Sequence, residues 1–479
     1  MTHNERLLLL TGKLAEKSLS RVVQSLAGKG YDCEVLNLGV SVAALMTADM
    51  IARRLDDARG AGRVIVPGLC AGDLDVAAGK LGVPVERGPV DLKDLPVWLG
   101  VEGRAPDLSR HDVQIFAEIV DAPRIGIEAI LDRAAAYRRD GADVIDLGCL
   151  PATPFPHLEE AVVALRAAGH RVSVDSMDVD ELRRGGQAGA DYLLSLKEST
   201  LALIDEVASV PVLIPEHPGD LESLARAMTT LRARGRHCIA DSILDPIHFG
   251  FTESIVRYHA LRQRFPEAAI MMGVGNLTEL TEADTAGMNA LLLGVMSELG
   301  IGHLLTTQVS PHACACVREI DRARRVMYAA REDNAVPKGY DGGLMATHER
   351  KPFPYSAEEI REVAALVRDP SYRVKVSAEG VHVFNRDDRV LGGDPFAIYP
   401  HLADIKGDAP HAFYMGVELA RAQIAWQLGK RYAQDTELDW GCAVEPGRRT
   451  APANTHAFKG EGPTLGDGRA RKGEAGGGA

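Results

Sequence analysis

The chain lacks the features expected of a secreted, membrane-spanning or nucleic-acid-binding protein. Its seven cysteines are scattered, odd in number and form no Cys-x-x-Cys pair, which argues against a disulfide framework. No apolar run reaches membrane-spanning length, and Leu7–Leu10 is too short for a signal-peptide core. A net charge of −13 disfavours nonspecific nucleic-acid binding, which needs a basic surface. We therefore expect a cytoplasmic protein with no membrane and no nucleic-acid partner.

One repeated unit dominates the middle of the chain: a short apolar strand that ends in a polar residue, followed by a helix. Such continuous apolar strands are typical of a parallel sheet that is buried on both faces. Eight of them occur, at 118–121, 144–148, 172–176, 192–195, 212–216, 238–241, 270–273 and 303–306. Eight units predict a (β/α)₈ TIM barrel, whose active site lies at the carboxyl ends of the strands.

The rest of the chain predicts two flanking domains, because 479 residues are too many for one core. Residues 1–105 alternate short strands and helices, as in a small Rossmann-like α/β domain. The barrel occupies residues 113–332, and residues 353–445 predict an α+β domain. The tail at 446–479 is Gly-rich, charged and almost free of apolar residues, so we expect it to be disordered.

Polar side chains at the strand ends are the candidates for the site, and several of them are carboxylates. Asp178 caps the following helix more naturally than Asp175 does, which leaves Asp175 free to face the barrel mouth. The wider set is Asp121, Asp146, Asp175, Ser195, Lys197, Glu216, His217, Asp241, Asp245, Asn276 and Thr306.

Clustered carboxylates suit a ligand that is rich in N–H donors. A 2-amino-4-oxo heterocycle presents an N–H and an NH₂ side by side, and one carboxylate accepts both in a fork. Mg²⁺ is the competing occupant, because it also prefers oxygen ligands. The Asp and Glu spacing matches no recognised metal motif, so no residue is assigned as a metal ligand.

Five segments of the barrel resemble the dihydropteroate synthases. Gly-Ala-Asp-Val-Ile-Asp-Leu-Gly at 141–148 resembles their second-strand signature, and Ser-Val-Asp-Ser at 173–176 their third-strand Ser-Val-Asp-Thr. Ala-Gly-Ala-Asp at 188–191 matches their run before strand four. Asp-Pro-Ile-His-Phe-Gly-Phe at 245–251 resembles Asp-Pro-Gly-x-Gly-Phe, and Gly-Val-Gly-Asn at 273–276 replaces Gly-Val-Ser-Arg. The resemblance implies the pterin-binding TIM-barrel superfamily.

The sequence departs from the synthases where they hold phosphate. Leu277 stands in place of the synthase Lys, and the loop at 152–156 reads Ala-Thr-Pro-Phe-Pro where synthases have Thr-Arg-Pro-Gly. The first-strand motif is reduced to Ile-Val-Asp-Ala-Pro at 119–123. Asn276 is closer to the Gly-x-Ser-Asn of the methyltetrahydrofolate-type methyltransferases. The three-domain layout resembles the synthase-related proteins that accompany tetrahydromethanopterin metabolism.

The resemblance implies a role for each matching residue. Asp175 and Asp245 would bind the pterin ring edge, with Asp241 as the alternative to Asp245. Ser195 would replace the strand-four Asn, and Asn276 would bond the pterin near N5. Asp121 and Asp146 complete the expected pterin site.

The implied activity is condensation of a dihydropterin-6-methyl diphosphate with an arylamine, in tetrahydromethanopterin biosynthesis and thus in one-carbon metabolism. The alternatives are a methyltransferase that moves a methyl group from a reduced methyl-pterin to a corrinoid protein, and a non-catalytic pterin-binding protein. Asn276 favours methyl transfer, but the chain holds no Asp-x-His-x-x-Gly corrinoid motif. Mg²⁺ and a homodimer are both compatible with the sequence.

Overall fold

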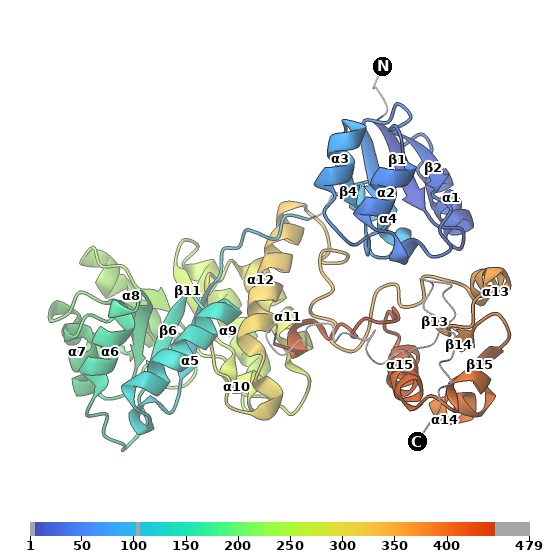
Figure 1. Cartoon of the computed structure of the whole chain (residues 1–479). Coiled ribbons are helices and arrows are strands. Elements are labelled where there is room, and N and C mark those ends of the chain that lie inside the picture. Colours follow the sequence, from blue (N-terminus) through green and yellow to red (C-terminus); the bar gives the residue numbers. More distant parts are fainter. Residues whose placement is uncertain (1–4, 102–105, 446–479) are drawn as a thin grey trace, which may run out of the picture. The chain divides into compact units, whose positions relative to one another are not determined.

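The computed structural model describes residues 5–101 and 106–445, which form two compact units. One unit contains the N-terminal α/β domain together with the C-terminal α+β domain, and the other is the barrel (Figure 1). The tail predicted to be disordered, 446–479, lies outside the described residues. Over the described ranges, no helix combines the length and apolar character needed to cross a membrane.

The barrel is closed by eight parallel strands in the order β10-β11-β12-β5-β6-β7-β8-β9. Closure comes from the pairing of the last strand with the first, in which His303 lies opposite Gln114. The strands are β5 (Gln114–Ile119), β6 (Val144–Gly148), β7 (Arg171–Asp175), β8 (Tyr192–Leu196), β9 (Val210–Leu213), β10 (Ile239–Ala240), β11 (Ala269–Gly273) and β12 (His303–Thr306). The predicted eight-stranded barrel is therefore confirmed.

Helices cover the outside of the barrel (Figure 1). They are α5 (Ile127–Asp140), α6 (Leu158–Ala167), α7 (Val179–Gln187), α8 (Leu221–Ala233), α9 (Phe251–Arg264), α10 (Gly275–Thr278), α11 (Thr285–Leu299) and α12 (Cys316–Glu332). The fourth unit departs from the predicted repeat, because a 3₁₀ helix, η4 (Glu198–Asp205), connects β8 to β9. Its buried Leu201, Leu203 and Ile204 replace the apolar face that an α-helix would supply.

Side-chain alternation along the strands decides what the barrel encloses. A core of Phe116, Val144, Leu194, Val212, Ile239 and Met271 fills the interior. Successive strand residues point to opposite faces, so the residue two positions further along faces the same interior, nearer the carboxyl end. On three of these strands that next position holds Glu118, Asp146 or Asp241. The strand pattern thus places carboxylates directly above an apolar plug.

The N-terminal domain is a four-stranded parallel sheet in the order β2-β1-β3-β4. Its strands are β1 (Glu5–Thr11), β2 (Tyr31–Asn37), β3 (Arg63–Val66) and β4 (Val85–Arg87). Its helices are α1 (Glu16–Ser25), α2 (Ala48–Arg54), α3 (Asp75–Leu81) and α4 (Leu95–Trp98). Leu8 and Leu10 face one apolar core, whereas Leu7 and Leu9 face a second, as expected for a sheet covered on both sides.

The C-terminal domain packs one long helix against a three-stranded antiparallel sheet. Its elements are α13 (Ala357–Leu366), β13 (Arg373–Ser377), β14 (Gly380–Phe384), β15 (Arg389–Gly392), α14 (Pro395–Ile398) and α15 (Ala409–Leu428). Ser377 pairs with Gly380, so the tight turn between β13 and β14 is Ala378-Glu379.

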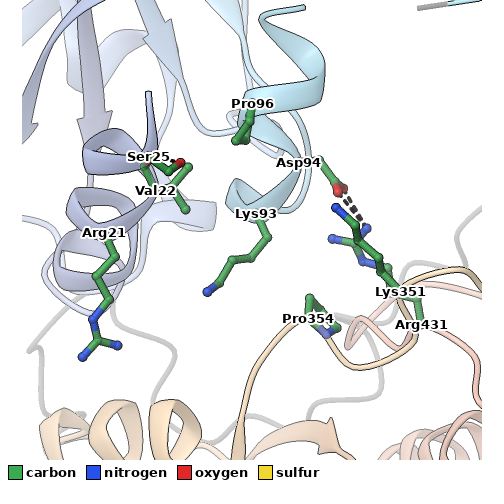
Figure 2. Close-up of a pocket in the computed structure, with 9 residues that line it drawn as sticks. All are labelled: Arg21, Val22, Ser25, Lys93, Asp94, Pro96, Lys351, Pro354 and Arg431. Atoms are coloured by element: carbon green, nitrogen blue, oxygen red, sulfur yellow. Dashed lines mark hydrogen bonds and ion pairs between the residues drawn. The ribbon is translucent and has the colours of Figure 1, made fainter. Parts of the chain in front are cut away.

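Ion pairs join these two domains within their unit. Arg431 pairs with Asp94 at 2.8 Å, and Figure 2 shows this contact beside a polar cavity of about 340 Å³. Arg431 also pairs with Asp91 at 2.8 Å, and Lys93 pairs with Glu359 at 2.8 Å. The N-terminal and C-terminal domains, which stand on either side of the barrel in the sequence, thus belong to one compact unit.

Candidate active site

Three carboxylates meet at the mouth of the barrel. Glu118 of β5, Asp146 of β6 and Asp175 of β7 each place one oxygen within 4.8 Å of the others. They sit at the carboxyl ends of neighbouring strands, where active sites of this fold are built. The strand alternation described above turns Glu118 and Asp146 inward. Ser173 of β7 bonds Asp146, so Asp175, two positions further along, faces the same side.

Asp146 carries the most informative atom of the cluster. Its side chain is fully buried, and Ser173 Oγ donates a hydrogen bond to its Oδ1. Its Oδ2 is buried and, among the described residues, has no hydrogen-bond partner. A buried acceptor without a partner costs about 1–3 kcal/mol, so this oxygen is matched to a donor or cation that residues 5–101 and 106–445 do not supply.

Burial and mutual repulsion keep the cluster partly protonated. Burial, together with the charge of Asp175, raises the pKa of Glu118 to about 8. Burial and the charges of Asp175 and Glu118 raise the pKa of Asp146 well above its usual range. Burial also raises the pKa of Asp175, although the hydrogen bond from Ser195 opposes this shift. Carboxyls with shifted pKa values in a concave site are typical of functional centres.

A β-bulge in β8 brings Ser195 to the mouth. The register of β8 against β9 shifts between Leu194 and Leu196, and Ser195 has φ of 131°, a conformation that a residue with a side chain rarely adopts. Its Oγ donates to Asp175 Oδ1 at 2.9 Å. Bulges beside active sites commonly redirect a side chain, and such backbone strain persists where the surrounding structure enforces it.

Asp241 lies at the end of β10 and is held by two donors. Tyr258 OH on α9 donates to its Oδ1 at 2.5 Å, and the Ile243 amide donates to the same oxygen at 2.7 Å. Burial raises the pKa of Asp241 to about 6, whereas both hydrogen bonds lower it. The charge of Asp175 raises this pKa further.

The other predicted residues lie outside this cluster. Asp245 is paired with Arg257 at 2.5 Å, and Arg257 also donates to the Ile243 carbonyl oxygen at 2.9 Å, so this ion pair fixes the loop after β10. Asp121 is half-buried and paired with Arg133 of α5. Asn276 is exposed, and its Nδ2 donates to the Leu244 carbonyl oxygen at 2.9 Å.

Among the wider set, Glu216 accepts hydrogen bonds from the Ser199 hydroxyl at 2.9 Å and the Ser199 amide at 3.1 Å, which ties it to η4. The structure therefore brings Asp146, Asp175 and Ser195 together at the mouth, and Asp241 follows β10 at the carboxyl end of the same barrel.

Sequence reasoning missed Glu118. It singled out Asp121, the last polar residue of the first unit, although Asp121 follows the strand. The alternation of side chains along β5 indicates its position: Phe116 faces the barrel interior, so Glu118, two residues later, faces the interior as well. Glu118 is found by counting two residues on from the interior Phe116, rather than by taking the last polar residue of the segment.

We expect Asp241 to make the stability of the barrel depend on pH. Its folded pKa of about 6 exceeds its unfolded value, so the folded state holds more protons between pH ~4 and ~6. The stabilisation that protonated Asp241 gives the folded barrel is therefore fully present below pH ~4 and is lost as pH rises through 6. The loss should reach up to about 3 kcal/mol, from ~1.4 kcal/mol per pKa unit.

Asp241→Asn keeps an oxygen acceptor for Tyr258 and Ile243 but cannot ionise. The difference in barrel stability between this variant and the wild type should therefore grow from pH 4 to pH 7 in favour of the variant. Hydrogen exchange of barrel peptides in urea, measured on the full chain, reports the stability of the barrel unit alone. A difference that is constant across this range would contradict the raised pKa.

Comparison with protein families gives one match. Residues 5–90 match a family of unknown function, DUF6513, which corresponds to the N-terminal α/β domain. An uncharacterized protein, MJ0107, from Methanocaldococcus jannaschii is 26% identical over 90% of this chain and 99% of its own length. The similarity to that protein thus extends over all three domains.

Comparison with solved structures gives dihydropteroate synthases. The enzyme from Vibrio fischeri is 13% identical and matches 47% of this chain and 94% of its own, with a TM-score of 0.38. The Yersinia pestis enzyme, solved as a sulfonamide drug complex, is 14% identical and matches 48% and 98%, with a TM-score of 0.38. The Anaplasma phagocytophilum enzyme, solved with 6-hydroxymethylpterin-monophosphate, is 15% identical and matches 45% and 98%, with a TM-score of 0.36.

Proposed function

We propose that the protein is a pterin-binding enzyme that condenses a dihydropterin-6-methyl diphosphate with an arylamine. The observation that carries the proposal is the cluster of inward carboxylates, in which a fully buried Asp146 oxygen has no partner among the described residues. The synthase-like motifs support it, because Asp146, Asp175 and Ser195 come from, or directly follow, those motifs. A site rich in acceptors is complementary to a ring edge rich in N–H donors.

Asp175 is the residue we propose for the ring edge. Its Oδ1 accepts from Ser195 and keeps a second lone pair, so Oδ1 and Oδ2 together can receive the N–H and NH₂ of the heterocycle in a fork. Without a metal ion, Glu118, with its raised pKa, can remain protonated beside it and so avoids two like charges at one place. Asp241 supplies a second acceptor that Tyr258 holds in position.

The proposed reaction needs little covalent chemistry from the protein. The arylamine nitrogen forms a bond to the exocyclic carbon, the carbon–oxygen bond to the diphosphate breaks, pyrophosphate leaves with the electron pair, and the amine loses a proton. Positioning of the two reactants and stabilisation of the leaving charge would account for most of the acceleration. The synthase Lys and Arg are absent from the matching positions, which are Leu277 and the loop at 152–156.

We further propose that Mg²⁺ can neutralise the cluster. Glu118 and Asp146, with Asp175 beside them, offer hard oxygen ligands, and the unpartnered Asp146 Oδ2 fits a cation as well as a donor. When bound, such an ion would supply positive charge for a phosphate group. Glu118 and Asp146 would hold it, which leaves Asp175 to orient the heterocycle.

Methyl transfer from a reduced methyl-pterin to a corrinoid protein is the second candidate. The exposed Asn276 favours it, because its Oδ1 is not engaged by the Nδ2 contact to Leu244 and can bond a pterin nitrogen. The absence of a corrinoid motif means that a partner protein would carry the acceptor. A tetrahydromethanopterin-type pterin is the substrate we propose for either reaction, from the likeness in domain layout.

The full chain should release pyrophosphate from a dihydropterin-6-methyl diphosphate only when an arylamine and Mg²⁺ are present. The assay compares 4-aminobenzoate with a ribofuranosyl-aniline and includes reactions without amine and without metal. Amine-dependent release supports condensation. No release, with methylation of an added corrinoid protein from methyl-tetrahydromethanopterin, would support methyl transfer instead. Tight binding of a plain reduced pterin with neither activity would indicate a non-catalytic pterin protein.

A further inference from the structure

The unit made by the N-terminal and C-terminal domains contains a cavity of about 510 Å³, independent of the carboxylate cluster. One wall consists of Leu9–Thr11 at the carboxyl end of β1 and of the loop that follows β3, including Pro67 and Gly68. The other wall consists of Arg373–Val376 of β13 and of Phe384. Its volume lies within the range of roughly 300–1,000 Å³ that small-molecule sites occupy.

The position of this cavity in the sheet is the one where α/β folds bind ligands. In the order β2-β1-β3-β4, the chain leaves β1 toward β2 on one side, and β3 pairs with β1 on the other. This reversal of strand order is a switch point, and a crevice opens there beyond the carboxyl ends of the strands. Leu10, Thr11 and Val66 lie at those ends and line the cavity.

The lining is mainly apolar and includes one cation without an acidic partner. Lys375 points over the Tyr355 ring, with Nζ at 4.4 Å from the ring centroid. Among the described residues it makes no hydrogen bond and no ion pair. By contrast, Arg373 on the same strand pairs with Asp369 at 2.5 Å.

The acidic groups around Lys375 are engaged elsewhere. Asp91 accepts from Tyr355 OH at 2.9 Å and pairs with Arg431, and Glu359 pairs with Lys93 at 2.8 Å. Burial lowers the pKa of Lys375, and the charge of Asp91 opposes this. An amine that is held in an apolar cavity without a carboxylate partner gains from an anion supplied by a ligand.

We infer that this cavity binds a small aromatic carboxylate, with its ring between Leu14, Val363 and Phe384, which line the cavity and pack in one apolar cluster, and its carboxylate on Lys375 Nζ. Lys375, the cation without an acidic partner, sets the charge of the ligand. The mainly apolar walls favour an aromatic ring as the rest of the ligand. This inference does not rest on the function proposed for the barrel.

Titration calorimetry of the full chain with 2-naphthoate, and with the uncharged 2-naphthalenemethanol, tests the inference. We expect the wild type to bind 2-naphthoate. Lys375→Met should weaken that binding at least tenfold, whereas binding of the alcohol should change by less than twofold. Lys375→Arg should restore most of the affinity for 2-naphthoate. Lys29→Met, which removes an exposed lysine of the same unit, is the matched control and should have no effect.

A labelling experiment on the wild type avoids any folding defect of the variants. An acetylating reagent should modify Lys375 more slowly when 2-naphthoate is present, with the modification of Lys29 unchanged, as read by mass spectrometry. Absence of 2-naphthoate binding at millimolar concentration would overturn the inference. So would an affinity that Lys375→Met leaves unchanged, an equal loss for the acid and the alcohol, or no protection of Lys375.

Discussion

Asp175→Asn should weaken binding of a reduced pterin by about two orders of magnitude while leaving the fold intact. Asp175 is the carboxylate that receives Ser195 Oγ and shares the mouth with Glu118 and Asp146. The amide that replaces it has only one acceptor oxygen, so the fork to the heterocycle is lost. Each charge-assisted hydrogen bond contributes roughly 1.5–3 kcal/mol, and the loss of both corresponds to about 100-fold or more in affinity.

Asp178→Asn is the matched control for this experiment. Asp178 lies in the same strand-to-helix loop but caps α7, with its Oδ1 accepting from the Asp180 amide at 2.7 Å. Asn caps a helix about as well as Asp does, so stability and binding should both stay close to the wild type. Titration calorimetry with a reduced pterin measures the affinity. An unchanged affinity in Asp175→Asn would remove Asp175 from the ring-binding site.

The barrel was predictable because its physical signature is local. Each strand is a short apolar run that is buried on both faces, and each run is followed by a polar turn and an amphipathic segment. The same reasoning failed for η4, because the crossover between β8 and β9 buries Leu201, Leu203 and Ile204 in a 3₁₀ helix. Composition does not distinguish that arrangement from a short α-helix.

The joining of the two flanking domains could not be predicted from their separate patterns. Arg431 and Asp94 are far apart in the sequence, and nothing in the neighbourhood of either residue indicates the other as a partner. The inferred ligand cavity could not be predicted for the same reason, because its walls come from segments that are far apart in the sequence. The apolar residues of β1 read as core, and Lys375 reads as a surface residue of β13, until the fold brings both walls together.

The carboxylate cluster was predictable only in part. Asp146, Asp175 and Asp241 stand at strand ends, where sequence reasoning looked. Ser195 was chosen as a strand-end residue and given its role by resemblance, whereas its actual position depends on a bulge that the sequence does not reveal. For Asp245, the ion pair to Arg257 decides the direction of the side chain, and that partner lies on the following helix. Local sequence patterns predict where a residue stands along a strand, but they do not predict which side chain it pairs with.

Arg324→Met should destabilise the barrel by about 3–5 kcal/mol. Arg324 on α12 is 2% exposed and donates to the Val113 carbonyl oxygen at 2.6 Å and the Gly141 carbonyl oxygen at 3.0 Å. It also pairs with Asp143 and with Asp321. The last barrel helix is thereby joined to the start of β5 and to the turn before β6. Removing the cation leaves Asp143 with only the more distant Arg138 at 3.8 Å, while Asp321 keeps Arg325 at 2.9 Å, and breaking one side of a buried network typically costs this much.

Two further variants distinguish the loss of stability caused by breaking the buried network from the loss caused by removing any arginine of this helix. Arg331→Met removes a surface arginine of the same helix, whose pair with Asp112 is exposed, and should cost less than about 1 kcal/mol. Arg324→Met combined with Asp143→Asn removes one of the stranded charges and should recover part of the loss. Hydrogen exchange of barrel peptides in urea gives the free energies in the full chain. If Arg324→Met costs no more than Arg331→Met, the closure of this barrel depends on its apolar contacts and strand pairing, because the buried guanidinium then contributes no more than a surface charge.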